Sequence, residues 1–157
     1  IHFDVMDAPL IPDAAPLGVQ WITCPQFRDE RGVLSVAEHN KLPFVPQRTF
    51  WITSVPPEAQ RGGHAHRTTH ELLGALHGSC KLELQIPSQK IVVTLDSCSQ
   101  FIHIPAMVWA RLYDFSPEFV GLCFTSESYK ADGYLHTFDE YLKSYRVIKH
   151  NSIQHYF

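Results

Sequence analysis

The chain is poor in features that mark membrane and nucleic-acid proteins. None of its apolar runs approaches the roughly 20 residues of a membrane-spanning helix, and its first residues lack the basic start and apolar centre of a secretory signal. Basic residues are not in excess, since 13 lysines and arginines stand against 16 acidic residues. Nucleic-acid binding requires clustered positive charge. We therefore expect a cytoplasmic protein that binds neither membranes nor nucleic acid.

Cysteine is also scarce, and its spacing excludes the common cysteine-based sites. The four cysteines, Cys24, Cys80, Cys98 and Cys123, are far apart and form no Cys-x-x-Cys pair. This pattern is typical of free thiols that pack as small apolar side chains in a reducing compartment. We predict no disulfide.

Strand patterns fill most of the chain. Residues 81–86 alternate polar and apolar side chains at every step, which is the period of a half-buried strand. Aromatic and β-branched residues dominate 48–53. Similar runs occur at residues 18–23, 33–37, 71–76, 90–95, 101–104, 108–113 and 119–125. Turn residues such as Gly62-Gly63 and Pro87-Ser88 separate the runs, and many short strands of this kind predict a sandwich or barrel.

Helical signal is nearly missing. No strand–helix–strand unit of about 30 residues occurs, which disfavours a parallel α/β fold. One short helix is predicted at residues 132–141. We predict a single all-β domain over residues 1–157, with its core at about 17–125 and a C-terminal extension at 126–157.

Two histidines, His64 and His66, form the candidate reactive centre. Alternate residues of a strand point to the same face, so both imidazoles should enter one space. Their spacing to Glu71 and Gly78 resembles the first motif of the cupins, which are jelly-roll barrels. Two imidazoles and a carboxylate suit Mn, Fe, Ni or Zn. The second cupin motif normally adds a histidine, however, and Ala110 stands at that position. We therefore predict no tightly bound metal.

A longer series of motifs resembles the sugar-nucleotide 3,4-ketoisomerases of the WxcM-like group. Each motif alone is common, but their order and spacing over roughly residues 19–141 are specific. The motifs are Asp29-Glu30-Arg31-Gly32, Arg61-Gly62-Gly63-His64-Ala65-His66, Gly78-Ser79-Cys80-Lys81, Ile104-Pro105 with Val108-Trp109, Asp114-Phe115-Ser116-Pro117, Ser126-Glu127-Ser128-Tyr129, Tyr134, and Phe138-Asp139-Glu140-Tyr141.

The resemblance implies an all-β cupin jelly roll that forms a homodimer, with exchange of N-terminal strands as one form of it. Members of the group act without a metal or other cofactor on dTDP-4-keto-6-deoxyglucose. They move its carbonyl from C4 to C3 and so supply precursors of amino sugars for surface polysaccharides or antibiotics.

The paired histidines suit this reaction. The C3 proton is acidic because it lies next to the C4 carbonyl, and a neutral imidazole, with an ordinary pKa of about 6.5, is a suitable base. We assign His66 as the base and His64 as its partner, which donates a proton or holds the developing oxyanion. Arg31 and Arg61 are candidates for the substrate diphosphate, and Trp109 for packing against the nucleotide base or sugar.

Two positions depart from the group. Its members usually have a tyrosine in the strand before the glycines, where this chain has Phe50-Trp51. We place Trp51 among the substrate-binding residues. Glu71, also placed there, stands where the group often has glutamine, and its carboxylate would raise the basicity of a neighbouring histidine or complete a metal site. Three alternatives stay open: a metal-dependent cupin enzyme using His64, His66 and Glu71, a non-catalytic sugar-nucleotide-binding domain, and a 3,5-epimerase-like enzyme.

Overall fold

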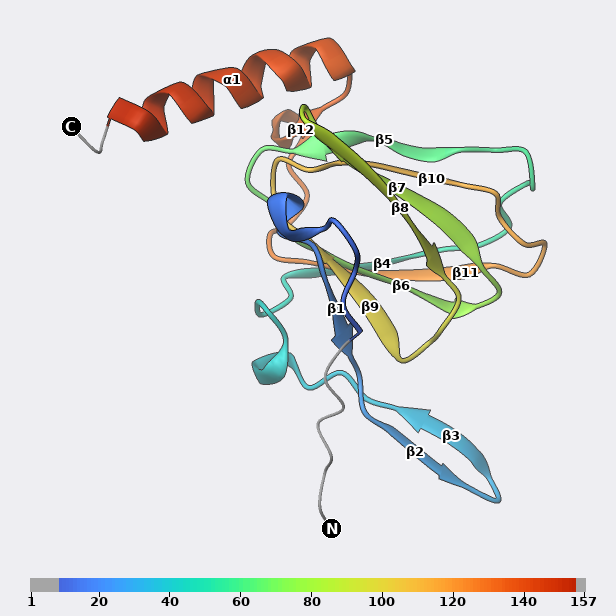
Figure 1. The fold of residues 1–157 in the computed structure, drawn as a ribbon. Helices are drawn as coiled ribbons and strands as arrows, with labels where there is room; N and C mark the ends of the chain where they lie inside the picture. Colours follow the sequence, from blue (N-terminus) through green and yellow to red (C-terminus); the bar gives the residue numbers. More distant parts are fainter. Residues whose placement is uncertain (1–8, 155–157) are drawn as a thin grey trace.

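Two five-stranded antiparallel sheets face each other in the computed structural model, which describes residues 9–154 (Figure 1). The first sheet has the order β1 (Gln20–Thr23), β9 (Gln100–Ile104), β6 (Glu71–His77), β11 (Val120–Thr125), β4 (Arg48–Ile52). The second has the order β12 (Tyr134–Leu135), β5 (Arg61–His66), β10 (Trp109–Tyr113), β7 (Cys80–Ile86), β8 (Gln89–Leu95). The predicted all-β fold is confirmed. The extent of the domain stays a prediction, because residues 1–8 and 155–157 lie outside the described part.

Alternation along the strands builds the core between the sheets. On β7, Leu82 and Leu84 are fully buried and Ile86 is nearly so, and they pack with inward residues of the facing sheet such as Ile102. Pro87-Ser88 closes the β7–β8 hairpin, in which Ile86 pairs with Gln89. Facing sheets with interleaved apolar side chains form the interior of a jelly roll. All four cysteines are free, as predicted.

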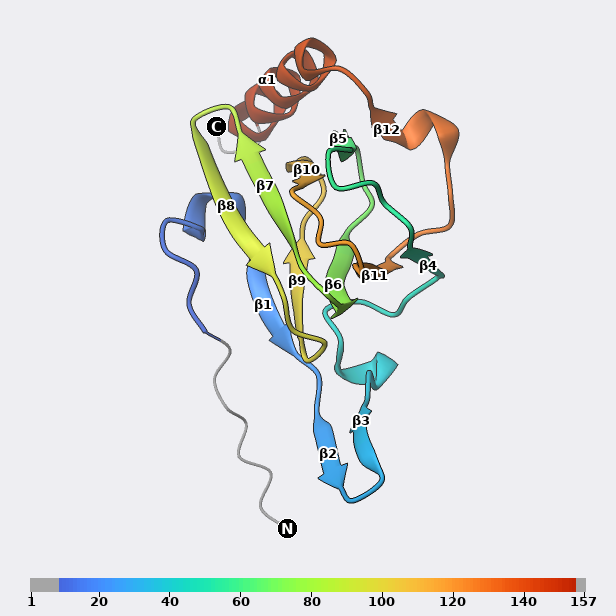
Figure 2. The same cartoon turned by 90° about the vertical axis from the view of Figure 1, so that its right-hand side faces the viewer.

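A separate hairpin leaves the barrel. Among residues 9–154, strands β2 (Gln26–Asp29) and β3 (Gly32–Ser35) pair only with each other. They project from the end of the molecule opposite to the C-terminal helix (Figures 1 and 2). All eight of its strand residues are exposed, including the apolar Phe27, Val33 and Leu34. The barrel of this chain therefore leaves an apolar hairpin uncovered.

The C-terminal extension differs from its prediction. Instead of a short helix at residues 132–141, it contains a 3-10 turn (Ala131–Gly133), the short strand β12, and the 17-residue helix α1 (Phe138–Gln154). The helix begins later because Thr137 caps it: the Glu140 backbone N–H donates to Thr137 Oγ1 at 3.2 Å. This Thr-x-x-Glu spacing is that of a capping box. β12 completes the edge of the second sheet beside β5.

One tyrosine anchors the helix on the barrel. Tyr141 is fully buried, and its hydroxyl donates to the backbone carbonyls of Met107, at 2.9 Å, and Gln85, at 3.2 Å. Beyond this first part, α1 runs past the barrel (Figure 1). No helix within residues 9–154 combines the length and the apolar character needed to cross a bilayer.

Candidate functional site

A cavity of about 380 Å³ opens between the two sheets, on the side of β4 and β5. Apolar side chains from β4, β6, β9 and β10 line its inner part. Its polar lining consists of Arg48, Arg61, His64, His66, Glu71 and Tyr134. A largely apolar hollow with a few convergent polar groups is the usual form of a small-molecule site.

Two glycines direct the histidines into this cavity. Gly62 and Gly63 both adopt left-handed backbone angles, with φ of 76° and 71°. The register of β5 against β10 shifts there, since Ala110 pairs with His64 but Arg111 pairs with Gly62. A Cβ atom on Gly62 would also lie 2.8 Å from the carbonyl oxygen of Ala110. The glycines thus form a β-bulge, a device that re-aims the side chains that follow it.

His64 and His66 lie side by side, and a carboxylate holds one of them. Their ring centroids are 5.1 Å apart with an interplanar angle of 87°. His66 Nε2 lies 2.8 Å from Glu71 Oε1, and the Cys123 thiol donates to Glu71 Oε2 at 3.1 Å. A carboxylate at Nε2 favours the proton on that nitrogen, which leaves Nδ1 as the acceptor. The arrangement therefore equips His66 to accept a proton at Nδ1.

Glu71 is ionised despite its burial. Burial raises the pKa of this carboxyl group, but the hydrogen bonds from His66 and Cys123 and the charges of His66 and His64 outweigh that effect. The net result is a pKa below the ordinary value of 4.5. This ionised carboxylate, 2.8 Å from Nε2, fixes the orientation of the His66 ring.

His64 is held in its neutral form. Burial lowers its pKa below the ordinary value of 6.5, and the neighbouring His66 and His136 lower it further. The carboxylate of Glu71 and a hydrogen bond between the ring and the backbone of Gly62 act in the opposite direction but do not compensate. Near neutral pH, His64 is therefore an uncharged imidazole that can exchange a proton with a bound molecule.

Of the predicted site residues, the structure brings together His64, His66, Glu71, Arg61 and Trp51. Arg61 and Trp51 line the cavity, and Trp51 lies at its rim with 69% of its surface exposed. These placements agree with the sequence assignment of cavity residues.

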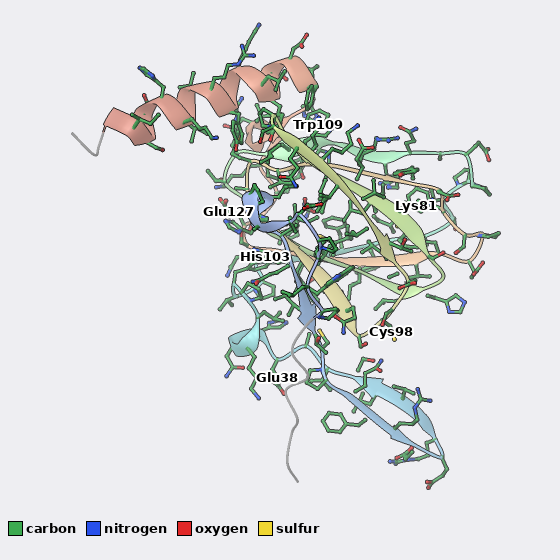
Figure 3. All side chains as sticks on the ribbon, viewed as in Figure 1. Glu38, Lys81, Cys98, His103, Trp109 and Glu127 are labelled. Atoms are coloured by element: carbon green, nitrogen blue, oxygen red, sulfur yellow. The ribbon has the colours of Figure 1, made fainter. Side chains whose placement is uncertain are left out.

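Arg31 and Trp109 lie elsewhere. Arg31 is in the turn of the β2–β3 hairpin, where it forms an ion pair with Asp29 and its side chain is 84% exposed. Trp109 precedes the pocket residue Ala110, so the alternation of β10 turns it to the opposite face. There its ring packs against Phe138, at a centroid distance of 5.4 Å, beneath α1 (Figure 3). In a single chain, neither residue can contact a molecule in the cavity.

Arg48 and Tyr134 line the cavity but were missed. Arg48 shares the inward face of β4 with Phe50, and its guanidinium lies 4.8 Å from that ring. The alternation of residues 48–52 was enough to predict that Arg48 and Phe50 share one face of the strand. Tyr134 lies on the two-residue strand β12, which is too short to show a sequence period.

Three of the cavity residues have the types and spacing of metal ligands. His64, His66 and Glu71 each offer one ligand atom, and these three atoms lie within 4.8 Å of one another. Imidazole and carboxylate ligands suit Mn, Fe, Ni and Zn. Ala110, which faces the same space, offers no donor.

Comparison with known proteins identifies the family. Residues 17–146 match the FdtA family, described as WxcM-like, C-terminal. The TDP-4-oxo-6-deoxy-alpha-D-glucose-3,4-oxoisomerase of Aneurinibacillus thermoaerophilus is 33% identical over 116 residues, which are 73% of this chain and 84% of that protein. The 3,4-ketoisomerase QdtA of Thermoanaerobacterium thermosaccharolyticum, solved with TDP, has a TM-score of 0.78 and 32% identity, over 80% of this chain and 92% of that chain.

A second QdtA structure, a histidine-to-asparagine variant with TDP-4-keto-6-deoxyglucose, also has a TM-score of 0.78, with 31% identity over 80% of this chain and 91% of that chain. The resemblance drawn from the sequence motifs, including the cupin jelly roll, is confirmed. The chain belongs to the FdtA family of WxcM-like, C-terminal domains.

Proposed function

We propose that this protein is a cytoplasmic 3,4-ketoisomerase that moves the carbonyl of dTDP-4-keto-6-deoxyglucose from C4 to C3. The observation that carries the proposal is the pair His64 and His66, held beside Glu71 in a cavity between the sheets. The relatives support it, because one is named as a 3,4-oxoisomerase of this sugar and another was solved with it. The free thiols suit a reducing compartment.

The chemistry begins at C3. His66 Nδ1 takes the C3 proton, the C3–H electron pair forms a C3=C4 double bond, and the C4 carbonyl oxygen becomes an enediolate oxygen. This oxygen then gains a proton while the C3 hydroxyl loses one, and we assign the exchange of these protons to His64. Protonated His66 then delivers its Nδ1 proton to C4, which restores the neutral base and leaves the carbonyl at C3. General-base catalysis of this kind contributes about 10²–10⁴-fold to the rate.

Two arginines would bind the diphosphate. Arg48 on β4 and Arg61 on β5 reach the cavity from the two facing sheets. Among the described residues that line the cavity, Glu71 is the only acidic one, and it is paired with His66. The cavity therefore favours a ligand with negative charge. Guanidinium groups can bind phosphate oxygens through two parallel hydrogen bonds.

The uncovered hairpin supports a homodimer in which β2 and β3 pack against a second copy. Phe27 and Leu34 are 49% and 64% exposed, and such apolar side chains on an isolated hairpin gain stability when a partner covers them. If the hairpin packs against a second copy in this way, Arg31, at the hairpin turn, can reach the partner's cavity. Light scattering at micromolar concentration tests the proposal, and a monomer would contradict it.

The activity is tested by NMR with dTDP-4-keto-6-deoxyglucose in D₂O. If the proposal is right, deuterium enters C3 of the remaining substrate or C4 of the product, and the product has its carbonyl at C3. Exchange at C5 would instead indicate the epimerase, and TDP binding without exchange would indicate a non-catalytic binding domain.

A metal-dependent enzyme is the second candidate, because His64, His66 and Glu71 can offer three ligand atoms to one ion. Metal analysis of untagged protein tests it. Stoichiometric Fe, Mn, Ni or Zn would favour this candidate, especially if chelation abolished turnover.

A further inference from the structure

The C-terminal extension contributes one aromatic side chain, Tyr134, to the lining of the candidate site. We propose that Tyr134 is a positioning residue, whose ring holds the imidazoles of His64 and His66 in the orientation that proton transfer requires. This inference rests on the proposed ketoisomerase function and assigns a part in it to a residue outside the strands that carry the histidines.

Strand pairing places Tyr134 directly opposite the proposed base. β12 runs antiparallel to β5, with Tyr134 paired to His66 and Leu135 paired to Ala65. Side chains of directly paired residues lie on the same face of a sheet. Leu135, one residue on, is fully buried on the other face, in a cluster with Ala65 and Tyr141. The burial of Leu135 thus fixes the face on which Tyr134 lies.

The ring of Tyr134 contacts both imidazoles. Its centroid lies 4.5 Å from that of His66, with an interplanar angle of 51°, and 5.0 Å from that of His64, with an angle of 74°. Edge-to-face and tilted pairs at such distances are favourable. The tyrosine ring therefore lies against one side of each imidazole and limits the orientations that each can adopt. His66 also has a polar tether, because its Nε2 lies 2.8 Å from Glu71 Oε1.

The tyrosine is itself well supported. His136 stacks on its ring at 5.5 Å, nearly parallel at 7°. The turn before β12 is tied to β5, since the Arg67 backbone N–H donates to the Gly133 carbonyl at 2.8 Å and Arg67 Nε donates to the Asp132 carbonyl at 3.2 Å. After β12, Tyr141 anchors the helix to the barrel. The segment therefore holds the Tyr134 ring in a fixed position against the two histidines.

Misplacement of a reacting group by about 1 Å can reduce the rate roughly 100-fold. Removal of the ring should therefore lower kcat more than it lowers substrate affinity. We expect Tyr134→Ala to lower kcat about 10–100-fold while the Kd for TDP changes less than about twofold. Tyr134→Phe keeps the ring and should restore kcat to within about threefold of the wild type.

A matched control is Tyr145→Ala, which removes an equal ring from the barrel-facing side of α1 without touching the cavity. It should change stability but leave kcat within about threefold. If Tyr134→Ala also keeps kcat within threefold, the inference is wrong. It is equally wrong if Tyr134→Phe is as impaired as Tyr134→Ala, because the hydroxyl would then be the active group.

The NMR signals of the His64 and His66 rings separate this inference from the proposed function. In Tyr134→Ala these signals should broaden or split, because the rings then adopt more than one orientation, and in Tyr134→Phe they should stay as narrow as in the wild type, whether or not the sugar is converted. A wild-type protein without isomerase activity would overturn the proposed function. Imidazole signals in Tyr134→Ala that shift through loss of the tyrosine ring but stay single and narrow would overturn the positioning role.

Discussion

Replacement of His66 by asparagine separates its chemical role from its structural one. Asparagine cannot act as a base near neutral pH, so His66→Asn should lower kcat about 10²–10⁴-fold, which corresponds to roughly 3–5 kcal/mol in activation free energy. Binding of TDP should persist, because the proposed phosphate ligands are Arg48 and Arg61 at the cavity wall. Turnover is measured by NMR with the keto-sugar, and TDP affinity by calorimetry.

The same change should destabilise the fold. His66 and Glu71 are only 10% and 11% exposed, and their atoms lie 2.8 Å apart. Removal of the imidazole leaves a buried carboxylate with the Cys123 thiol as its remaining partner. We expect a loss of about 2–3 kcal/mol in the free energy of unfolding, or a decrease of roughly 4–10 °C in Tm for a domain of this size.

A double variant tests the physical reason for that loss. His66→Asn combined with Glu71→Gln removes the unpaired charge, so at least about half of the lost stability should return while kcat stays low. His77→Asn, at an exposed position on β6, is the control and should leave both quantities unchanged. The reasoning is refuted if His66→Asn keeps turnover within tenfold of the wild type, or if the double variant is no more stable than the single one.

Three other changes have defined outcomes. Arg48→Ala and Arg61→Ala should each weaken TDP binding about tenfold, roughly 1.4 kcal/mol, with kcat at saturation nearly unchanged; calorimetry that finds no weakening would contradict the phosphate assignment. Because the pKa of Glu71 lies below its ordinary 4.5, the ionised group stabilises the fold above that pH and loses this contribution as the pH falls through its folded pKa. Wild-type stability in urea should therefore fall more steeply below pH 4.5 than that of Glu71→Gln, and parallel curves would argue against it. Tyr141→Phe removes the one hydroxyl proton that the carbonyls of Met107 and Gln85 share, and should lower the free energy of unfolding by about 1–3 kcal/mol. Tyr129→Phe, at a 63% exposed position, should leave the free energy of unfolding unchanged.

The barrel and the histidine pair were predictable because both follow from alternation along strands. Residues 81–86 and 71–76 correspond closely to β7 and β6, and the i, i+2 spacing of His64 and His66 predicted their shared cavity. The spacing to Glu71 predicted a carboxylate nearby, and the structure places it 2.8 Å from His66.

The differences between the predicted and the observed placements have particular causes. Trp109 was assigned by resemblance, but the alternation of β10 was enough to place it opposite Ala110, outside the cavity. The helix was predicted too early because the acidic and aromatic residues after Gly133 resemble a helical turn, whereas the cap at Thr137 sets its start. Arg31 could not be placed, because the direction in which a hairpin leaves a barrel depends on packing far along the chain.

The late position of β12 in the chain has a consequence for how the protein folds during its own synthesis. Every strand of the first sheet and four strands of the second leave the ribosome before β12 and α1 do. The barrel can therefore begin to fold on a nascent chain in which the histidines are still uncovered on the Tyr134 side. Catalytic competence is then gained last, when the C-terminal segment docks, so during synthesis in vitro activity should appear only after β12 and α1 have left the ribosome.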